Sequence, residues 1–492
     1  MQILRHNSHV FLRSIVTGIL ITICFISSAQ LPADSIYAIL NKEVYLKRSP
    51  SIIVGTIDST GKRQIVGAGS FSDKKEVQPD GNTMYEIGSV TKVFTTLLLA
   101  DMVLKKQVNL DDPISKYLPA HVKVPIIKGK AITIQHLATH SVGWPRMPDN
   151  YDPQNPDNPF ADYTVEQLHD YISRSSFDYA PGTWFSYSNP GYGLLGHILS
   201  LVAGKPYETL VKERICGPLG MTNTTIMLSP AQKTNLAGGH AEYGAPVQNW
   251  DMPAIAGTGA LRSNINDMLN FAAANLGMVK TDLYPAMQLA HIPRLTKGPG
   301  DGDVTLGWTY EKEKRTGDEF IWKDGTTGGY KSILLLNKTK KTAVVILANS
   351  MNQLNDLAFH ILYPPAPVKP YRYTWAMHDL ILATAKSKGV DAAIEEYRSM
   401  KANRSPGLIF DPNQLNYVAN DLRIAKKMSA AIKIFELNAQ EYPNNAMVLE
   451  SLGEAYKRSG KKKEAIETYE KVVQLDTKNE HAKWMLEKLK AN

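Results

Sequence analysis

The chain has 492 residues, of which 43% are hydrophobic and 21% charged, and it carries a formal net charge of +8. These proportions are ordinary for globular proteins and exclude a disordered or collagen-like chain. The two cysteines, Cys24 and Cys216, are too few for a disulfide framework or for a zinc or iron–sulfur site built on cysteine. At about 100–200 residues per domain, the length predicts roughly three domains.

Residues 1–29 have the layout of a secretory signal peptide. Arg5 and Arg13 precede an apolar run over 15–26, and the small residues 27–29 follow it. We therefore predict secretion across the inner membrane to the periplasm. An uncleaved anchor is the alternative, although the run is shorter than the about 20 residues of a spanning helix. Cleavage removes two of the +8 charges, and the remaining +6 is spread along the chain and does not indicate a nucleic-acid partner.

Residues 31–363 mix strand-like and helix-like patterns. The β-branched and apolar stretches 51–57 and 342–347 predict buried strands. Between 89 and 105 the apolar residues recur at helical spacing, which predicts a helix that begins at Ser89.

A stiff spacer is predicted at 364–373. Four prolines, at 364, 365, 367 and 370, lie within seven residues. Such a density is incompatible with a helix interior or a central strand and favours an extended linker between domains.

The following region, 374–492, has helical patterns throughout and contains a repeat. When 412–445 is aligned with 446–479, at an offset of 34 residues, small and large apolar residues coincide, as Ala431 does with Ala465. A period of 34 resembles the tetratricopeptide repeat, a pair of packed helices.

Two further units complete the predicted repeat region. A degenerate unit precedes residue 412, and a capping helix covers 480–491. The resemblance implies a groove for a peptide or a partner protein, and a purely stabilising appendage is the alternative.

Ser89 and Lys92 form a Ser-x-x-Lys motif at the start of the predicted helix. Three residues apart on a helix, the two side chains share one face. A serine hydroxyl becomes a nucleophile when a neighbouring base takes its proton. Burial and the positive end of a helix dipole both favour the neutral, basic form of lysine. The motif alone is weak, because a serine at this place is also a common helix cap.

Two further motifs favour a catalytic serine over a helix cap at residue 89. Tyr-x-Asn at 187–189 and Lys-x-Gly at 323–325 follow Ser-x-x-Lys in chain order. This order resembles the serine β-lactamases and penicillin-binding proteins, and Tyr-x-Asn in place of Ser-x-Asn is similar to class C β-lactamases and their relatives. The segments 133–143, 217–224 and 259–268 also resemble segments of that family. The resemblance covers about residues 31–363.

The resemblance implies proton-transfer roles for three residues. Ser89 would attack a carbonyl carbon and become acylated, while Lys92 and Tyr187 would share the proton transfers. Tyrosine has a reference pKa of about 10, so the cations Lys92 and Lys323 would have to favour its phenolate.

The resemblance also implies a set of substrate contacts. Asn189 would hold Lys92 and contact the substrate, and Lys323 would bind it. Gly325 would allow the substrate close to the backbone, which a Cβ would obstruct. The backbone N–H groups of Ser89 and Thr326 would form the oxyanion hole.

The third motif departs from the family pattern. Class C β-lactamases have Lys-Thr-Gly, and this chain has Asp324 in place of the threonine. If Asp324 points into the site, its charge would repel a β-lactam carboxylate. If it points away, little changes, because adjacent strand residues face opposite sides.

Three other sequence features suggest functions that we considered and did not favour. His136 and His140 could suggest a Ser-His pair, but Ser-x-x-Lys already supplies a base, so a structural role is favoured. The loop 150–158 is rich in Asp and Asn but lacks the spacing and glycine of an EF-hand, which favours a loop beside the active site over a metal site. Glu166 is not followed by asparagine at 170, so the class A deacylation signature is absent.

These observations predict an α+β fold of the β-lactamase/transpeptidase type, with an antiparallel sheet flanked by helices and a helical lobe, followed by an all-α repeat domain. The predicted function is a secreted serine hydrolase that forms an acyl-enzyme with β-lactams or D-alanyl cell-wall peptides. No cofactor, metal, nucleic acid or membrane-spanning segment of the mature chain is expected. The alternatives are a carboxylesterase on small acyl esters with the same residues, and a partner-binding repeat protein with a weak or silent hydrolase domain.

Overall fold

The computed structural model describes ten stretches of the chain. They are residues 31–46, 48–72, 76–155, 157–175, 180–241, 245–296, 302–368, 376–403, 410–477 and 479–491. The predicted signal peptide lies outside the described residues, as does part of the predicted linker. Within the described stretches, no helix combines the length and the apolar character needed to cross a bilayer.

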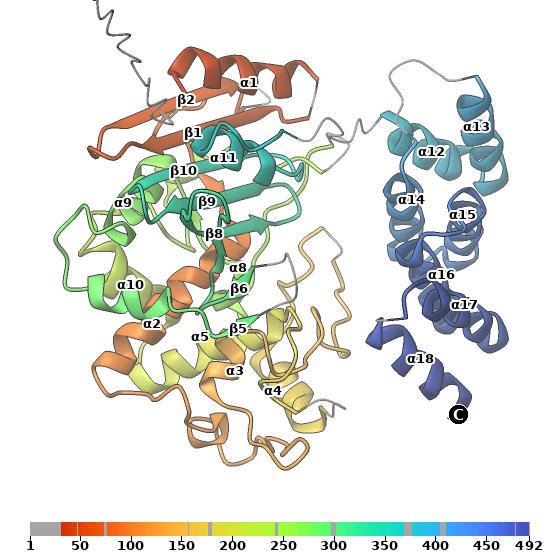
Figure 1. Ribbon diagram of the computed structural model, residues 1–492, viewed down its shortest axis with the longest axis horizontal. Helices are drawn as coiled ribbons and strands as arrows, with labels where there is room; N and C mark the ends of the chain where they lie inside the picture. Colours follow the sequence, from red (N-terminus) through yellow and green to blue (C-terminus); the bar gives the residue numbers. More distant parts are fainter. Residues whose placement is uncertain are drawn as a thin grey trace, which may run out of the picture.

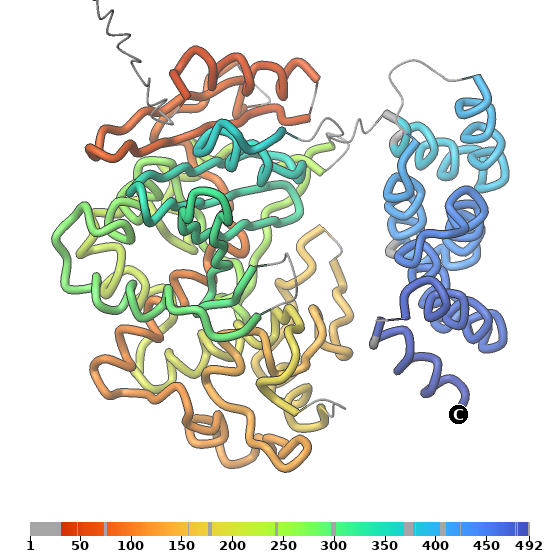
Figure 2. Tube along the Cα trace, viewed as in Figure 1, coloured from red at the N-terminus to blue at the C-terminus, as the bar shows by residue number. Residues whose placement is uncertain are grey.

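An antiparallel sheet of eight strands forms the centre of the first domain (Figure 1). Its strands run in the order β2-β1-β10-β9-β8-β7-β6-β5. The strands are β1 (Ser51–Ile57), β2 (Arg63–Gly69), β5 (Leu295–Thr296), β6 (Asp303–Val304), β7 (Thr309–Lys312), β8 (Glu319–Thr326), β9 (Lys331–Asn337) and β10 (Thr342–Ala348). The structure thus confirms the strands predicted at 51–57 and 342–347, which pair with each other, so segments far apart in the sequence lie side by side (Figure 2).

Both faces of the sheet are covered, which explains why β1 and β9 are buried at every position. Alternate residues point to opposite faces. On β1, Ile52 and Val54 pack with α1 (Ala33–Tyr45) and α11 (Asn355–Leu362), whereas Ile53 and Ile57 join a larger core with α2 (Thr91–Leu104) and α9 (Ile265–Asn275).

The remaining helices of the first domain form a lobe, and most of them contribute residues to this same larger core (Figure 1). They are α3 (Ile134–Ala138), α4 (Val165–Arg174), α5 (Asn189–Ala203), α6 (Tyr207–Val211), α7 (Pro230–Thr234), α8 (Ala256–Gly259) and α10 (Tyr284–Ala290). Short turns and a two-stranded sheet complete it: η1 (Gly88–Val90), η2 (Ile114–Lys116), η3 (Lys212–Cys216), β3 (Tyr85–Glu86) and β4 (Arg262–Ser263). The α+β fold with a flanked antiparallel sheet is therefore confirmed.

The helix predicted from residue 89 begins as the short turn η1 and continues as α2. Helix α2 is buried from Thr91 to Met102. It runs through the larger core, where Phe94 stacks on Phe271 of α9 with ring centroids 4.2 Å apart. A helix fixed on all sides is a rigid support for residues at its first turn.

The secondary structure of the described residues after 375 consists of helices joined by turns and loops. The helices are α12 (Ala376–Ser387), α13 (Val390–Ala402), α14 (Pro412–Ile424), α15 (Met428–Glu441), α16 (Ala446–Arg458), α17 (Lys462–Leu475) and α18 (Glu480–Ala491). Both α16 and α17 begin and end 34 residues after α14 and α15. Small residues allow close packing within a pair, as at Gly453, where a Cβ would lie 3.0 Å from the Tyr469 ring. The domain boundaries and the tetratricopeptide identity stay predictions.

Candidate active site

The motif residues come from three separate elements. Ser89 lies in η1 and Lys92 in the first turn of α2. Tyr187 lies just before α5, Asn189 is the first residue of α5, and Lys323 lies on β8. Ser89 does not cap α2, because the cap position is Val90 and carries no side-chain hydrogen bond.

Ser89 is within hydrogen-bond distance of two ionisable groups. Lys92 Nζ donates to Ser89 Oγ at 3.1 Å, and Tyr187 Oη lies 2.8 Å from the same oxygen. Ser89 is half-buried and Lys92 is completely buried. A partly accessible hydroxyl with a base at hydrogen-bond distance is the arrangement that nucleophilic catalysis requires.

Lys92 is held in one position by polar groups that satisfy its ammonium. Besides Ser89, it donates to Asn189 Oδ1 at 3.1 Å and to the backbone oxygen of Thr258 at 2.8 Å. Burial, together with the nearby Lys323, lowers the pKa of Lys92 to about 8, although Tyr187 acts in the opposite direction. The contact predicted between Asn189 and Lys92 is present.

Tyr187 is surrounded by positive charge. Burial alone would raise the pKa of its phenol, but the ammonium groups of Lys323 and Lys92 outweigh that effect and lower the pKa to about 7. Each of these two nitrogens lies 4.9 Å from the centre of the Tyr187 ring. Near neutral pH, Lys92 therefore holds its proton more tightly than Tyr187 does.

The backbones of η1 and β8 approach each other closely at two glycines. A Cβ on Gly88 would lie 2.9 Å from the backbone nitrogen of Thr326, and a Cβ on Gly325 would lie 2.9 Å from the backbone nitrogen of Ser89. Gly88 also has a φ of +47°, which side chains rarely tolerate. The two amides predicted for the oxyanion hole thus lie beside each other.

Asp324 pairs with a lysine instead of standing unpaired. Lys331 Nζ donates to Asp324 Oδ2 at 2.6 Å and to Thr326 Oγ1 at 3.0 Å. Burial would raise the pKa of Asp324, but Lys331 and Lys323 keep the pKa of this carboxyl below its usual value. Because strand residues alternate, Asp324 points to the sheet face opposite Lys323. This is the case in which Asp324 points away from the site.

The two histidines have structural contacts. The His140 ring stacks on the Tyr187 ring with centroids 4.3 Å apart, and its Nδ1 accepts a hydrogen bond from the Ser188 amide at 3.0 Å. His136 Nδ1 accepts from the Thr133 amide and so caps α3. These contacts support Tyr187 and α3, in accordance with the structural role favoured above.

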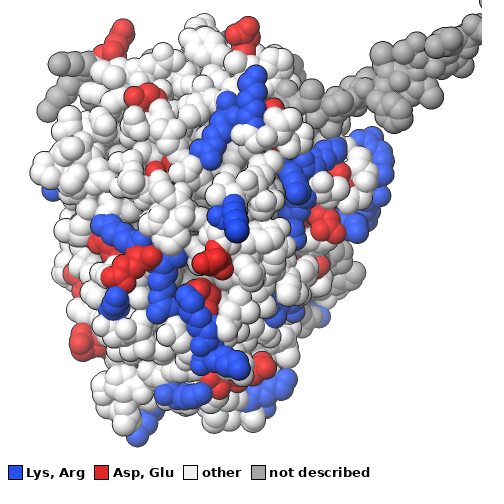
Figure 3. Space-filling view, turned by 90° about the vertical axis from the view of Figure 1, so that its left-hand side faces the viewer, with Lys and Arg blue, Asp and Glu red and all other residues white. Residues whose placement is uncertain are grey.

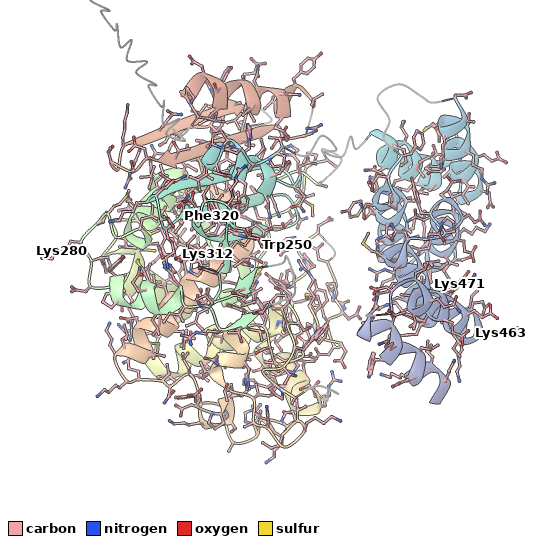
Figure 4. All side chains as sticks on the ribbon, viewed as in Figure 1. Trp250, Lys280, Lys312, Phe320, Lys463 and Lys471 are labelled. Carbon is pink, nitrogen blue, oxygen red and sulfur yellow. The ribbon has the colours of Figure 1, made fainter. Side chains whose placement is uncertain are left out.

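The Asp- and Asn-rich loop binds another loop of the first domain. Asn158 and Asp251 exchange two hydrogen bonds of 2.9 and 2.8 Å. Trp250, labelled in Figure 4, contacts Phe160 with ring centroids 5.0 Å apart, and a Cβ on Gly328 would lie 2.6 Å from its indole nitrogen. Gly328 lies two residues after the end of β8, so the loop lies near the end of the strand that carries Lys323.

Two residues near Tyr187 were missed in the sequence. The Arg146 guanidinium carbon lies 5.1 Å from the centre of the Tyr187 ring, and Thr258 contributes only its backbone oxygen to Lys92. A backbone oxygen has no sequence signature. Arg146 lies shortly after the recognised segment 133–143, and that proximity was the only available signal.

Comparison with known proteins gives one consistent result. The family profile described as Beta-lactamase matches residues 51–362. The D-alanyl-D-alanine-carboxypeptidase/endopeptidase AmpH of Escherichia coli strain K12 is 31% identical over 302 residues, which cover 57% of this chain and 77% of that protein. A Beta-lactamase of Pseudomonas fluorescens is 27% identical over 322 residues, which cover 59% and 86%.

Solved structures agree with these sequence matches. The crystal structure of a beta-lactamase/D-alanine carboxypeptidase from Yersinia pestis, complexed with citrate, aligns with a TM-score of 0.57 and 25% identity. The alignment covers 65% of this chain and 93% of that one. The helices after residue 375 thus lie beyond the matched family profile.

Proposed function

This chain belongs to the beta-lactamase family of serine hydrolases, and we propose that it hydrolyses D-alanyl peptides and β-lactams through an acyl-enzyme on Ser89. The observation that supports this most directly is the position of Ser89 Oγ between Lys92 Nζ and Tyr187 Oη. One of these groups can accept a proton while the other remains charged.

In the proposed acylation step, Ser89 Oγ attacks the substrate carbonyl carbon and its proton passes to the Tyr187 phenolate. Lys92 stays protonated and stabilises the phenolate before transfer. The N–H groups of Ser89 and Thr326 donate to the oxyanion, and one such donor contributes about 10²–10³ in rate. When the tetrahedral intermediate collapses, Tyr187 returns the proton to the leaving nitrogen.

Deacylation uses the same groups in reverse. Water enters after the leaving group departs, and Tyr187 takes a proton from it as it attacks the ester carbonyl. Ser89 Oγ then leaves and recovers its proton from Tyr187. General acid–base catalysis of this kind contributes about 10²–10⁴ in rate.

Mass spectrometry of the intact protein tests this proposal. We expect a penicillin to add one acyl group to the wild-type chain and none to Ser89→Ala. A D-alanyl-D-alanine peptide should be hydrolysed by the wild type and not by the variant. An adduct that persists in Ser89→Ala would contradict the proposal, as would a wild type that neither forms the adduct nor hydrolyses the penicillin. If a nitrophenyl ester is turned over while neither of the other substrates reacts, the carboxylesterase alternative is correct.

We further propose that the helices after residue 375 bind a segment of a partner protein. A groove is lined by side chains of α14, α16 and α18, among them Arg423, Met447, Glu450 and Trp484. Met447 is 51% exposed although it is apolar. Exposed apolar surface bordered by charges is typical of protein-binding sites.

A further inference from the structure

Arg146 adds a third cation beside Tyr187, from the loop that follows α3. Its guanidinium carbon lies 5.1 Å from the ring centre, compared with 4.9 Å for the nitrogens of both Lys92 and Lys323. Over the part of the chain that the structure describes, none of these three cations forms an ion pair with an acidic side chain. Uncompensated positive charge in a site attracts anionic ligands.

The backbone of Arg146 is fixed although its side chain is exposed. The Arg146 carbonyl accepts a hydrogen bond from the Asn189 amide at 3.1 Å. The neighbouring Trp144 is fully buried, and its carbonyl accepts from Ser186 Oγ at 2.8 Å. Pro145 and Pro148 further restrict this segment. The loop therefore fixes the backbone of Arg146 beside Asn189, and the guanidinium lies over the Tyr187 ring.

Arg146 differs from the two lysines in its exposure. Lys92 and Lys323 are 0% and 9% exposed, so their charges act mainly on the buried phenol between them. Arg146 is exposed, and its planar group can form two parallel hydrogen bonds with a carboxylate. It lies on the Asn189 side of the site, whereas Lys323 reaches Tyr187 from β8.

We propose that Arg146 determines specificity by binding a carboxylate on the acyl part of the substrate, so that acyl donors with a negative charge there react in preference to neutral ones. This inference rests on the proposed acyl-enzyme function and names the substrate class within it. A hydrogen bond to a charged group contributes enough for a preference of about tenfold.

Two thioesters that differ only in acyl-side charge test the inference. N-succinyl-D-alanyl and N-acetyl-D-alanyl thioesters share one neutral leaving group, and the ratio of their kcat/KM values is measured. We expect a ratio of about ten for the wild type and about one for Arg146→Gln. Arg146→Lys should give an intermediate ratio. The matched control Arg63→Gln removes an exposed arginine of β2 and should leave the wild-type ratio unchanged.

The outcomes separate the inference from the proposed function. If the wild type hydrolyses neither thioester, the proposed function fails and the inference fails with it. If the wild type hydrolyses both at equal rates, only the inference fails. If Arg146→Gln keeps the wild-type ratio of the two kcat/KM values, the inference is overturned. It is also overturned if the substitution changes only the pH profile. Either result would leave Arg146 a positioning role at most. Thermal unfolding of each variant verifies that the fold is retained.

Discussion

Tyr187 and Lys92 form a pair in which both pKa values are lowered into the range around neutral pH, with that of Lys92 remaining the higher. Free lysine and tyrosine have similar reference pKa values, near 10. Here the pKa of Tyr187 is lowered to about 7 and that of Lys92 to about 8. Lys323 contributes to both shifts, because a positive charge stabilises a phenolate and destabilises a second ammonium.

The pH dependence of kcat/KM should reflect this pair. We expect activity to rise with pH as Tyr187 loses its proton near pH 7, and to fall as Lys92 loses its proton near pH 8. Because the two groups interact, the rising and falling limbs of the pH profile report the titration of the pair and not that of either residue alone. Lys323→Gln removes a charge that lowers both pKa values, so both limbs should move to higher pH. Tyr187→Phe should lower kcat by about 10²–10⁴.

Kinetics from pH 5.5 to 9.5 check this prediction, with Lys280→Gln as the control. Lys280 is exposed and lies at the edge of the first domain, as Figure 4 shows. A profile of Lys323→Gln that coincides with that of the wild type would contradict it, as would full activity of Tyr187→Phe.

Among individual residues, those that belong to motifs could be predicted from the sequence. Ser89, Lys92, Tyr187, Asn189 and Lys323 were all predicted, and the structure brings them together. The orientation of a single side chain depends on a partner in three dimensions. The sequence therefore left both directions of Asp324 open, and the pairing with Lys331 emerged only from the register of β8 and β9.

A row of three imidazoles joins α4 to α5 and to the loop before residue 122. The ring of His169 lies 5.7 Å from that of His121 and 5.3 Å from that of His197, measured between centroids. Burial lowers the pKa of both His169 and His197, and each of these histidines has another histidine beside it that lowers its pKa further. Glu166 acts in the opposite direction on both.

This row should make the first domain less stable in mild acid. The folded chain holds His169 and His197 neutral down to a lower pH than the unfolded chain, in which histidine takes up its proton at about pH 6.5. Their contribution to stability is therefore complete above pH 6.5 and is lost as the pH falls below it. We expect the melting temperature to fall between pH 7 and pH 5, and to fall less in His169→Phe, which keeps a ring but cannot be protonated.

Calorimetry at several pH values measures this difference, and His360→Phe serves as the matched control. His360 lies on α11 and is only half-buried. An equal pH response of the wild type and His169→Phe would contradict the prediction.

Secondary-structure elements could be predicted where their sequence has a regular period. The repeat offset of 34 residues reappears in the bounds of α14 to α17, because each helix pair buries the same pattern. The sequence placed Asp324 on a strand but did not predict the bounds of β8, since Lys323, Asp324 and Gly325 interrupt its apolar pattern. Those residues are tolerated there because β7 pairs only with the first half of β8, which leaves its end free for the site. The histidine row has no common motif and requires the fold to bring its members together.

The whole molecule has two sets of hydrophobic cores. Two clusters belong to residues before 367, and two others belong to residues after 376. Charged side chains are interspersed, with no extended region of one sign, on the face of the molecule drawn in Figure 3. Separate cores would allow the helices after residue 375 to bind the proposed partner without changing the geometry around Ser89.

The groove lined by α14, α16 and α18 is where such a partner should bind. A photoreactive benzoylphenylalanine in place of Met447 would lie in the groove. At Lys471, an exposed residue of α17 that Figure 4 labels, it serves as the control. In the full chain, irradiated in the cells that make it, we expect a covalent adduct from position 447 and none from position 471.

A charge reversal within the groove makes the experiment decisive. Arg423 lines the groove and is half-buried, and burial lowers the pKa of its guanidinium. Arg423→Glu should reduce the adduct from position 447 about tenfold, as the loss of a charged hydrogen bond would, while penicillin still acylates Ser89. Equal adducts from positions 447 and 471, or none from 447, would contradict partner binding and favour a stabilising role for these helices. Loss of acylation in Arg423→Glu would instead show that the two sets of cores depend on each other.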